Sequence, residues 1–224
     1  MDCFSCAHCR TQGCKTADGR YPDFCPTAAL SKEKADAVTK KMNKSRKIGK
    51  IARIAAEVEG LFYCQMTRVE ETVEFLQRSG AKKVGIATCV GLINETRLLT
   101  KIFDKKGVEY YVVCCKVGAV DKSEIGIPDE HKVNKGRTYE SMCNPIMQAE
   151  LLNEQGTDFN IIMGLCCGHD MLFTMHSKAP VTTLVVKDRV LCHNPVLALY
   201  GSETMYSRFK DKPVDTPADK SAVK

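Results

Sequence analysis

The sequence contains no tryptophan and few other aromatic residues, which make up 7% of its 224 positions. A core without large rings must be filled by Ile, Val, Leu, Met and Cys. No apolar run approaches the roughly 20 residues that a helix needs to cross a bilayer. The N-terminus also lacks the charged-then-apolar pattern of a secretory signal. We therefore expect a cytoplasmic protein with no membrane partner.

Several common motifs are missing as well. The chain has no Walker loop, no G-x-G-x-x-G fingerprint and no H-E-x-x-H zinc motif. Nothing in the sequence therefore supports nucleotide binding or a zinc-protease site.

Acidic residues are scarce in one stretch. Between Ser31 and Ala56 there are nine Lys or Arg residues and only two acids, within a chain of net charge +6. Such a helix is either a solvated face or a docking surface for an acidic protein partner. No aromatic residue lies between Lys32 and Leu61 to stack on bases, so nucleic acid is not an expected partner.

Cysteine, by contrast, is abundant, with 13 residues. The odd number and the adjacent pairs argue against a disulfide framework. Clustered thiols in a reducing compartment indicate soft-metal binding, redox chemistry or sulfur transfer. Cys64 alone has the surroundings of an ordinary core residue.

The order of expected elements predicts the fold. A long basic helix begins near Ser31, and a second helix spans about Met66 to Arg78. Short apolar runs then alternate with helices at 92–105 and 144–153, and the runs cover residues 83–88, 108–114, 159–165 and 181–186. This alternation predicts crossover units and a parallel sheet. We expect an α/β fold, a small Rossmann-like three-layer sandwich with a mostly parallel four-stranded sheet, preceded by a cysteine-rich metal knuckle and the basic helix. The expected parts are residues 1–30, 31–206 and a flexible tail at 207–224.

The first cysteine group lies in residues 1–30. Four thiols have the spacing C-x2-C-x4-C-x10-C, namely Cys6, Cys9, Cys14 and Cys25. Zinc and 4Fe–4S clusters both take four thiolates. Pro26 directly after Cys25 and the single C-x2-C hook favour iron–sulfur, and zinc is the alternative. Cys3 offers an alternative set with Cys6, Cys9 and Cys14, and His8 is a further possible ligand.

The second group follows the expected strands. Cys89, Cys115 and Cys166 come at the ends of three strands, and Cys143 precedes a helix start, where the helix dipole favours a thiolate. Ligands of parallel sheets collect beyond the carboxyl ends of strands. We therefore expect these four cysteines to form one metal site, although buried structural cysteine is the alternative for each. Cys114 and Cys167, the sequence neighbours of Cys115 and Cys166, are expected to point away from this site.

Polar residues near this edge are candidates for further roles. His169 follows Gly168 at a helix start and could act as an acid or base, or cap and pack the helix. Residues 187–195 follow the last strand and could close the pocket. The irregular stretch from Lys116 to Glu140 is expected to be a lid, a binding loop or disordered.

Several phrases of the sequence resemble a known family. They are GIATCVGL at 85–92, CCKVG at 114–118, CNP at 143–145, the segment 164–170, and 179–191. Over about residues 6–200 the chain is similar to an uncharacterised family of prokaryotic cysteine-rich proteins of unknown function, usually labelled metal-binding. The resemblance implies metal ligands at Cys6, Cys9, Cys14, Cys25, Cys89, Cys115, Cys143 and Cys166. Cys3, Cys167 and Cys192 are additional in this chain.

Three functional hypotheses follow. The first is an iron–sulfur protein with an N-terminal cluster and a second thiolate site that serves redox or sulfur-related chemistry on a small molecule or with a redox partner, with His169 beside it. The second is a zinc-stapled, non-catalytic binding protein. The third is a metal-free thiol enzyme that forms a persulfide on Cys166 or Cys89.

Overall fold

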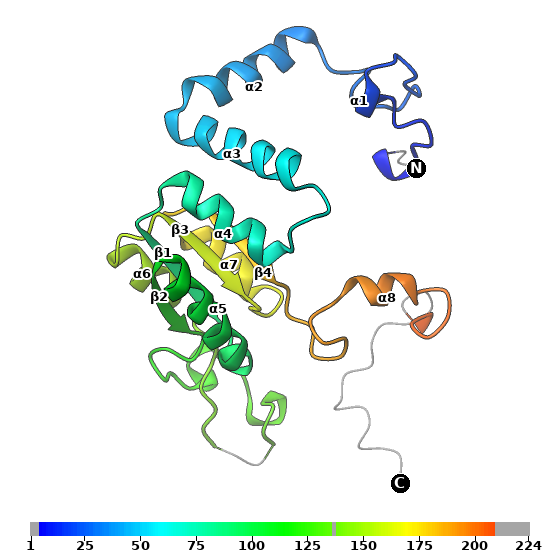
Figure 1. Cartoon of the computed structure of the whole chain (residues 1–224). Helices are drawn as coiled ribbons and strands as arrows, with labels where there is room; N and C mark the ends of the chain where they lie inside the picture. Colours follow the sequence, from blue (N-terminus) through cyan, green and yellow to red (C-terminus); the bar gives the residue numbers. More distant parts are fainter. Residues whose placement is uncertain (1–4, 136–137, 209–224) are drawn as a thin grey trace. The chain divides into compact units, whose positions relative to one another are not determined.

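The computed structural model of the protein describes residues 5–135 and 138–208 (Figure 1). The chain divides into two compact units, Met1–Leu61 and Phe62–Lys224. Cys3 and all but two residues of the expected tail at 207–224 lie outside the described residues. No helix within the described ranges is long and apolar enough to span a membrane.

The first unit holds two short helical turns and two longer helices. The turns are η1 (Cys6–His8) and α1 (Gly13–Thr16), and the helices are α2 (Lys32–Lys44) and α3 (Arg46–Phe62). The expected single basic helix is wrong, because the chain breaks at Ser45. There the backbone is extended, and the Ser45 hydroxyl accepts a hydrogen bond from the N–H of Ile48 at 3.2 Å, which starts a new helix. Serine favours such capping positions over helix interiors.

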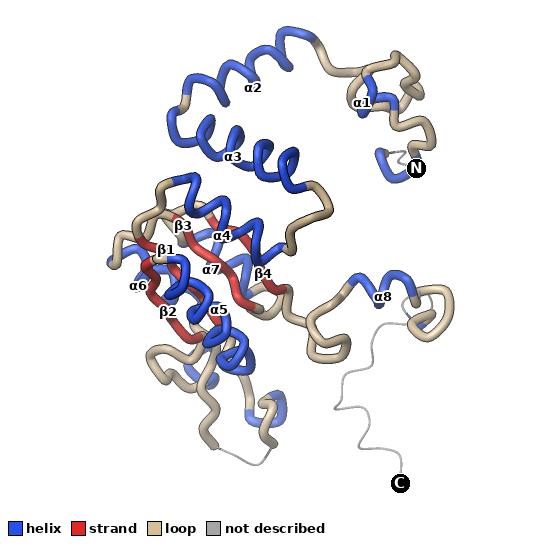
Figure 2. The backbone as a smooth tube through the Cα atoms, in the orientation of Figure 1, coloured by secondary structure: helices blue, strands red, loops and turns tan. Residues whose placement is uncertain are grey.

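The second unit contains the predicted parallel sheet. Its strands are β1 (Lys83–Thr88), β2 (Glu109–Cys114), β3 (Phe159–Met163) and β4 (Val181–Val185), and all neighbours pair in parallel in the order β2-β1-β3-β4 (Figure 2). The helices are α4 (Arg68–Ser79), α5 (Ile93–Lys106), α6 (Pro145–Glu154), α7 (His169–His176) and α8 (Val196–Tyr200). The α/β prediction is confirmed, and each strand lies within two residues of its expected bounds.

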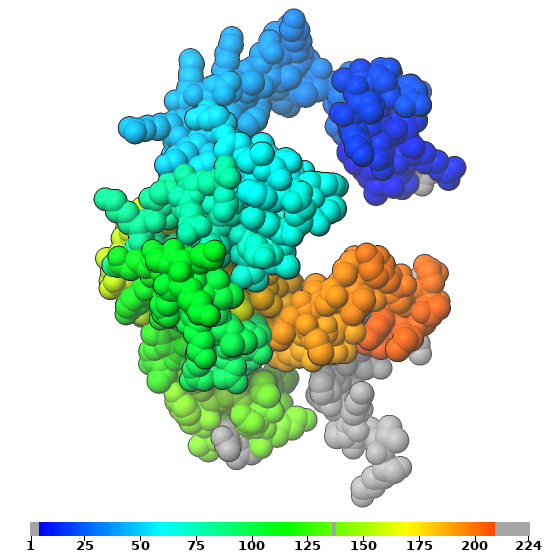
Figure 3. Space-filling model, viewed as in Figure 1, coloured from blue at the N-terminus to red at the C-terminus, as the bar shows by residue number. Residues whose placement is uncertain are grey.

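Two hydrophobic layers cover the sheet. On one face, Val84 and Ile86 of β1 pack with Phe103 of α5 and with side chains of α4. On the other face, Ala87 packs with Leu152 of α6 and with side chains of α7. Side chains of α4 and α5 hide most of the sheet in Figure 3. Both faces are buried, as a parallel sheet requires.

The strand order brings all carboxyl ends to one edge of the sheet. From β1 the chain moves to β2 on one side, and it then returns past β1 to β3 on the other side. The order therefore reverses between β1 and β3, which is where open α/β sheets bind their ligands. Cys89 follows β1 and Cys166 follows β3, so these two cysteines flank this switch point.

The long stretch after β2 is built around one lysine. Lys132 is 3% exposed, and its ammonium group contacts Asp121 at 3.0 Å, Asp129 at 2.7 Å and the Thr138 carbonyl at 2.7 Å. Lys122 also pairs with Glu140. The described part of this stretch contains the turns η3 (Lys122–Ile125) and η4 (Asp129–His131), and its role as a lid or binding loop stays a prediction.

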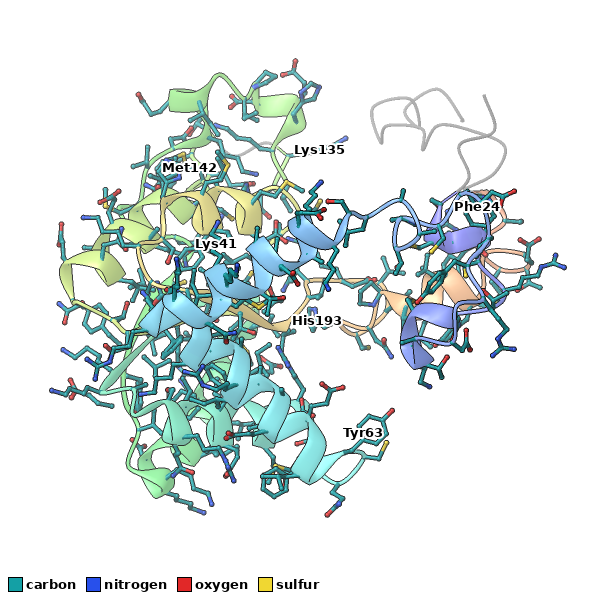
Figure 4. The ribbon with its side chains drawn as sticks, turned by 90° about the horizontal axis from the view of Figure 1, so that it is seen from above. Phe24, Lys41, Tyr63, Lys135, Met142 and His193 are labelled. Atoms are coloured by element: carbon teal, nitrogen blue, oxygen red, sulfur yellow. The ribbon has the colours of Figure 1, made fainter. Side chains whose placement is uncertain are left out.

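Cys64 lies outside the core, contrary to expectation. It is exposed, and it has a φ of 57° in the turn after α3. Residues in the left-handed region belong to turns, which place them at the surface. Tyr63 beside it is also exposed (Figure 4).

Gly164, at the end of β3, is expected to tolerate no side chain. Its φ is 73°, and an added Cβ would overlap Leu92, which is buried beside the sheet edge. We expect Gly164→Ala to lower the unfolding free energy by about 2–4 kcal/mol, from left-handed strain and overpacking together. Gly156→Ala is the control, because Gly156 has a φ of 63° with nothing near an added Cβ. Urea denaturation measures both, and equal losses would contradict the packing argument.

The loop around Lys132 is expected to lose its stabilisation in acid. Hydrogen bonds from Ser123, and then from Glu140 and Lys132, hold the pKa of Asp121 below its usual range. Lys122 lowers the pKa of Glu140 to about 2. Carboxylates with lowered pKa values stabilise the fold above their unfolded values near 4, and this stability disappears as the pH falls toward 2.

Asp121→Asn removes one of these carboxylates. We expect the variant to be less stable at pH 7, and its unfolding free energy to change less between pH 5 and pH 2 than that of the natural protein. Glu124→Gln, an exposed change in the same loop, serves as the control. If the two variants had the same pH dependence in urea titrations, the role of Asp121 would be refuted.

Candidate thiol site at the sheet edge

Two of the four N-terminal cysteines lie close enough to influence each other. The N–H of Gln12 donates to the Cys9 sulfur at 3.4 Å, and this bond, with others from Thr11, lowers the pKa of Cys9. Backbone N–H groups of Ala28 and Thr27 lower the pKa of Cys25, and a negative charge on Cys9 opposes that shift. Both sulfurs thus accept hydrogen bonds from the second and third residues after them, which favours the thiolate form. Cys6 and Cys14 are exposed.

Three cysteines from separate segments meet at the edge of the sheet. Cys89 follows β1, Cys115 follows β2, and Cys143 precedes α6. Cys115 forms side-chain hydrogen bonds with both Cys143 and Cys89, and its sulfur also accepts from the N–H of Val90 at 3.3 Å. We call these three residues the thiol row. Cys89 and Cys115 are buried, and Cys143 is half-buried.

The thiol row divides its protons unevenly. Hydrogen bonds to Cys143 and Cys89, together with burial, raise the pKa of Cys115, so it remains a thiol and donates. The bond from Cys115 is the main cause that lowers the pKa of Cys89 and of Cys143, in each case to about 5. These opposite shifts favour the thiol form of Cys115 and the thiolate forms of Cys89 and Cys143.

Positive groups accompany the sulfur atoms. Lys187, after β4, is a further cause of the lowered pKa of Cys89. The ammonium group of Lys116 lies 3.5 Å from the Cys143 sulfur, and the charge of His169 also favours the Cys143 thiolate. Arg189 donates to the Cys166 sulfur at 3.0 Å, and this bond raises the pKa of the guanidinium. Cysteines that merely fill a core are not matched with cations in this way.

Backbone bonds across the neck of the long loop hold Cys143 in place. The N–H of Asn144 donates to the Cys115 carbonyl at 2.7 Å, and the N–H of Met142 donates to Val120 at 2.8 Å. Lys116 closes the neck by donating to the Ser141 carbonyl at 2.6 Å. Figure 4 labels Met142 beside this point, and His193 on the segment that follows β4.

A buried acceptor without a partner lies on α6, whose Gln148 contacts the backbone at the ends of β1 and β2. Gln148 of α6 is completely buried, and its amide nitrogen donates to the carbonyls of Thr88 and Val113 at 3.2 and 2.7 Å. Its side-chain oxygen is the one buried polar side-chain atom in the described ranges without a hydrogen-bond partner. Buried acceptors without partners are rare, so a donor from a ligand or water is expected here.

The remaining candidates take different places. Cys166 is bonded to Arg189, and within the described residues no hydrogen bond joins it to the thiol row, so its role as a fourth ligand stays a prediction. Cys167 and Cys192 are exposed, and all cysteines in the described segments are free. His169 is half-buried. The sequence places residues 187–195 after the last strand, but only the structure shows that Lys187 acts on Cys89 and that Arg189 contacts Cys166.

The donor set fits a soft metal or an iron–sulfur centre in its chemistry. Three cysteine sulfurs meet at the sheet edge, and two of them have lowered pKa values, which favours the metal-binding thiolate form. Within residues 5–135 and 138–208, however, no three Cys, His, Asp or Glu side chains are arranged as a ready metal site.

Comparison with known proteins identifies the family of the chain. Residues 25–184 match the family described as "Protein of unknown function (DUF1847)". The chain belongs to this family, and the match includes the thiol row and Cys166 but stops before Lys187. An uncharacterized protein of Methanocaldococcus jannaschii is 54% identical over 151 residues, which are 67% of this chain and 76% of that protein.

The pairing of Lys116 with Cys143 gives a pH-dependent prediction for the metal-free protein. Iodoacetamide reacts with the thiolate, so its rate at Cys143 should level off at a pH well below the value for ordinary cysteine. Lys116→Met removes the cation and should move this midpoint upward by about one pH unit. Mass spectrometry of the labelled peptide measures the rate.

Lys187→Met is the matched control. Lys187 acts on Cys89, so this variant should leave the Cys143 profile close to that of the natural protein. Equal displacement of the Cys143 midpoint by both variants would show that general charge, rather than contact, sets its reactivity.

Proposed function

We propose that this member of the DUF1847 family is an iron–sulfur protein with two inorganic centres. The first is a 4Fe–4S cluster held by Cys6, Cys9, Cys14 and Cys25. The second is held by the thiol row at the sheet edge and serves redox or sulfur-related chemistry on a small molecule or with a redox partner.

The meeting of three thiols at the strand edge carries this proposal. Cys89, Cys115 and Cys143 come from three segments, and they converge beside the switch point of the sheet. A parallel sheet presents its ligand site at that edge. Thiolates are the preferred ligands of iron–sulfur centres and other soft metals.

Hydrogen bonds at the N-terminal element support the first centre. Backbone N–H groups already stabilise charge on the sulfurs of Cys9 and Cys25, as ligands in a metal–thiolate site require. Cys25 is followed by Pro26, a pairing found at the end of bacterial ferredoxin motifs. Zinc on the same four thiols is the alternative, and elemental analysis separates the two.

The side chains around the thiol row have clear tasks when a centre is bound. An iron–sulfur centre supplies one-electron transfer or an open iron for a ligand. Lys116 and Lys187 offset negative charge on the sulfurs, which favours the reduced state of any bound centre. We assign proton transfer at this edge to His169, and its electrostatic interaction with Cys143 supports that role.

Protein purified without exposure to air tests the proposal. We expect a brown protein with acid-labile sulfide and about four iron atoms per cluster, and an electron paramagnetic resonance signal after reduction. Cys9→Ala should remove only the N-terminal iron, and Cys115→Ala only the iron at the sheet edge. Cys64→Ala is the control, because Cys64 is exposed and belongs to neither group.

Two outcomes would count against this assignment. A colourless protein with stoichiometric zinc would show that the first centre is a structural zinc site and not a 4Fe–4S cluster. An unchanged iron content in Cys115→Ala would show that the thiol row holds no iron–sulfur centre.

A further inference from the structure

Cys166 differs from the other three cysteines at the sheet edge. Its sulfur accepts a hydrogen bond from Arg189 at 3.0 Å, and in the described part of the chain it shares no hydrogen bond with the thiol row. It nevertheless belongs to the same site, because negative charge on Cys89 and Cys143 also acts on Arg189. The guanidinium of Arg189 is therefore bonded to one sulfur and interacts through charge with two others.

Access separates these sulfurs further. Cys89 and Cys115 are 5% and 2% exposed, so a molecule from solvent cannot reach them without rearrangement. Cys166 is half-buried, and Arg189 beside it is exposed. Cys143 is also half-buried, but its cation, Lys116, is half-buried too and donates to the Ser141 carbonyl as well. Cys166 is therefore the sulfur at this edge whose bonded cation is itself exposed to solvent.

We propose that Cys166 is the sulfur-accepting residue of this site and that Arg189 binds the anionic sulfane-sulfur donor, a persulfide or polysulfide. This inference rests on the proposed function, because it leaves the thiol row to the inorganic centre. It gives that site a substrate class, and it gives Cys166 a role other than fourth ligand.

The chemistry needs no additional oxidant or reductant. The Cys166 thiolate attacks the outer sulfur of the donor and forms a new S–S bond. The S–S bond of the donor breaks, and its electron pair leaves with the remaining thiolate or shortened polysulfide. The sulfane sulfur keeps its oxidation level throughout, so one thiolate and one persulfide simply exchange places.

Arg189 is suited to bind both the incoming sulfur donor and the persulfide that forms on Cys166. A guanidinium has five N–H donors in a planar fork, and one nitrogen already binds the Cys166 sulfur. No other hydrogen bond of Arg189 is found among the described residues, so its remaining donors are available for an anion. It can therefore hold the incoming donor against Cys166 and stabilise the persulfide anion that forms.

Sulfur loading of the whole, anaerobically purified protein tests this inference. One arm uses inorganic polysulfide, and a second uses the persulfide of a small organic thiol, which distinguishes the two sources of sulfur. After excess reagent is removed, cyanide-reactive sulfur is measured, and mass spectrometry locates the added atom. Iron is measured in the same samples.

We expect loading at Cys166 in at least one arm, and its loss in Cys166→Ser with iron unchanged. Arg189→Met should slow loading about 10- to 100-fold, the value of a hydrogen bond to a charged group, and Arg189→Lys should restore part of the rate. Cys167→Ser and Cys192→Ser are controls, because both residues are exposed thiols outside the proposed contact.

Each contrary result has a distinct meaning. Loss of sheet-edge iron in Cys166→Ser would make Cys166 a ligand and overturn this inference, but it would leave the proposed function intact. Loading that is absent, that falls on Cys167 or Cys192, or that is unaffected by Arg189→Met would overturn it as well. Absence of iron with normal loading of Cys166 would instead refute the proposed function.

Discussion

The register between β1 and β2 is the constraint on which the sheet-edge site depends. Thr88 pairs with Cys114, and the N–H of Cys115 donates to the Thr88 carbonyl at 2.8 Å. The residue that follows each of these two strands is therefore a cysteine on the same face of the sheet, and Cys89 lies beside Cys115. A shift of one residue would turn Cys115 to the opposite face, because side chains alternate along a strand. Backbone hydrogen bonds thus decide which sulfurs can interact.

The third sulfur depends on a loop rather than on a strand. Cys143 lies 28 positions after Cys115, and it returns to that residue because backbone bonds from Asn144 and Met142 close the neck. Inside the loop, the buried Lys132 joins carboxylates and a carbonyl that would otherwise repel or remain solvated. Removal of one partner from such a cluster leaves uncompensated charge, so the loop closes as a unit. The conformation of the loop and the position of Cys143 therefore depend on the same contacts.

Charge at the edge explains why several cysteines can lie together. Burial alone would keep every thiol neutral, because charge is costly away from water. Here Cys115 keeps its proton and gives hydrogen bonds to two neighbours, while Lys187, Lys116 and Arg189 each lie near one sulfur. The cations come from residues just after β2 and β4, so the strands that gather the sulfurs also gather their counter-charges. A site of this kind can hold an electropositive centre or an anionic sulfur donor.

The sequence by itself determined the parallel α/β fold, since the apolar runs and glycine-ended helices between residues 66 and 186 carry local signals of period and length. It also determined that cysteines follow three strands, and that the edge would be rich in sulfur. It did not reveal the break between α2 and α3 at Ser45, where the serine hydroxyl caps a new helix although the sequence pattern is helical on both sides. It also did not reveal that Cys64 is exposed. Only the tertiary structure decided that Cys115 forms hydrogen bonds with both Cys89 and Cys143. It also decided that Arg189 donates to Cys166, and that the side-chain oxygen of Gln148 has no hydrogen-bond partner. These contacts join residues far apart in the chain, and they depend on strand register and loop closure, which no short stretch of sequence encodes.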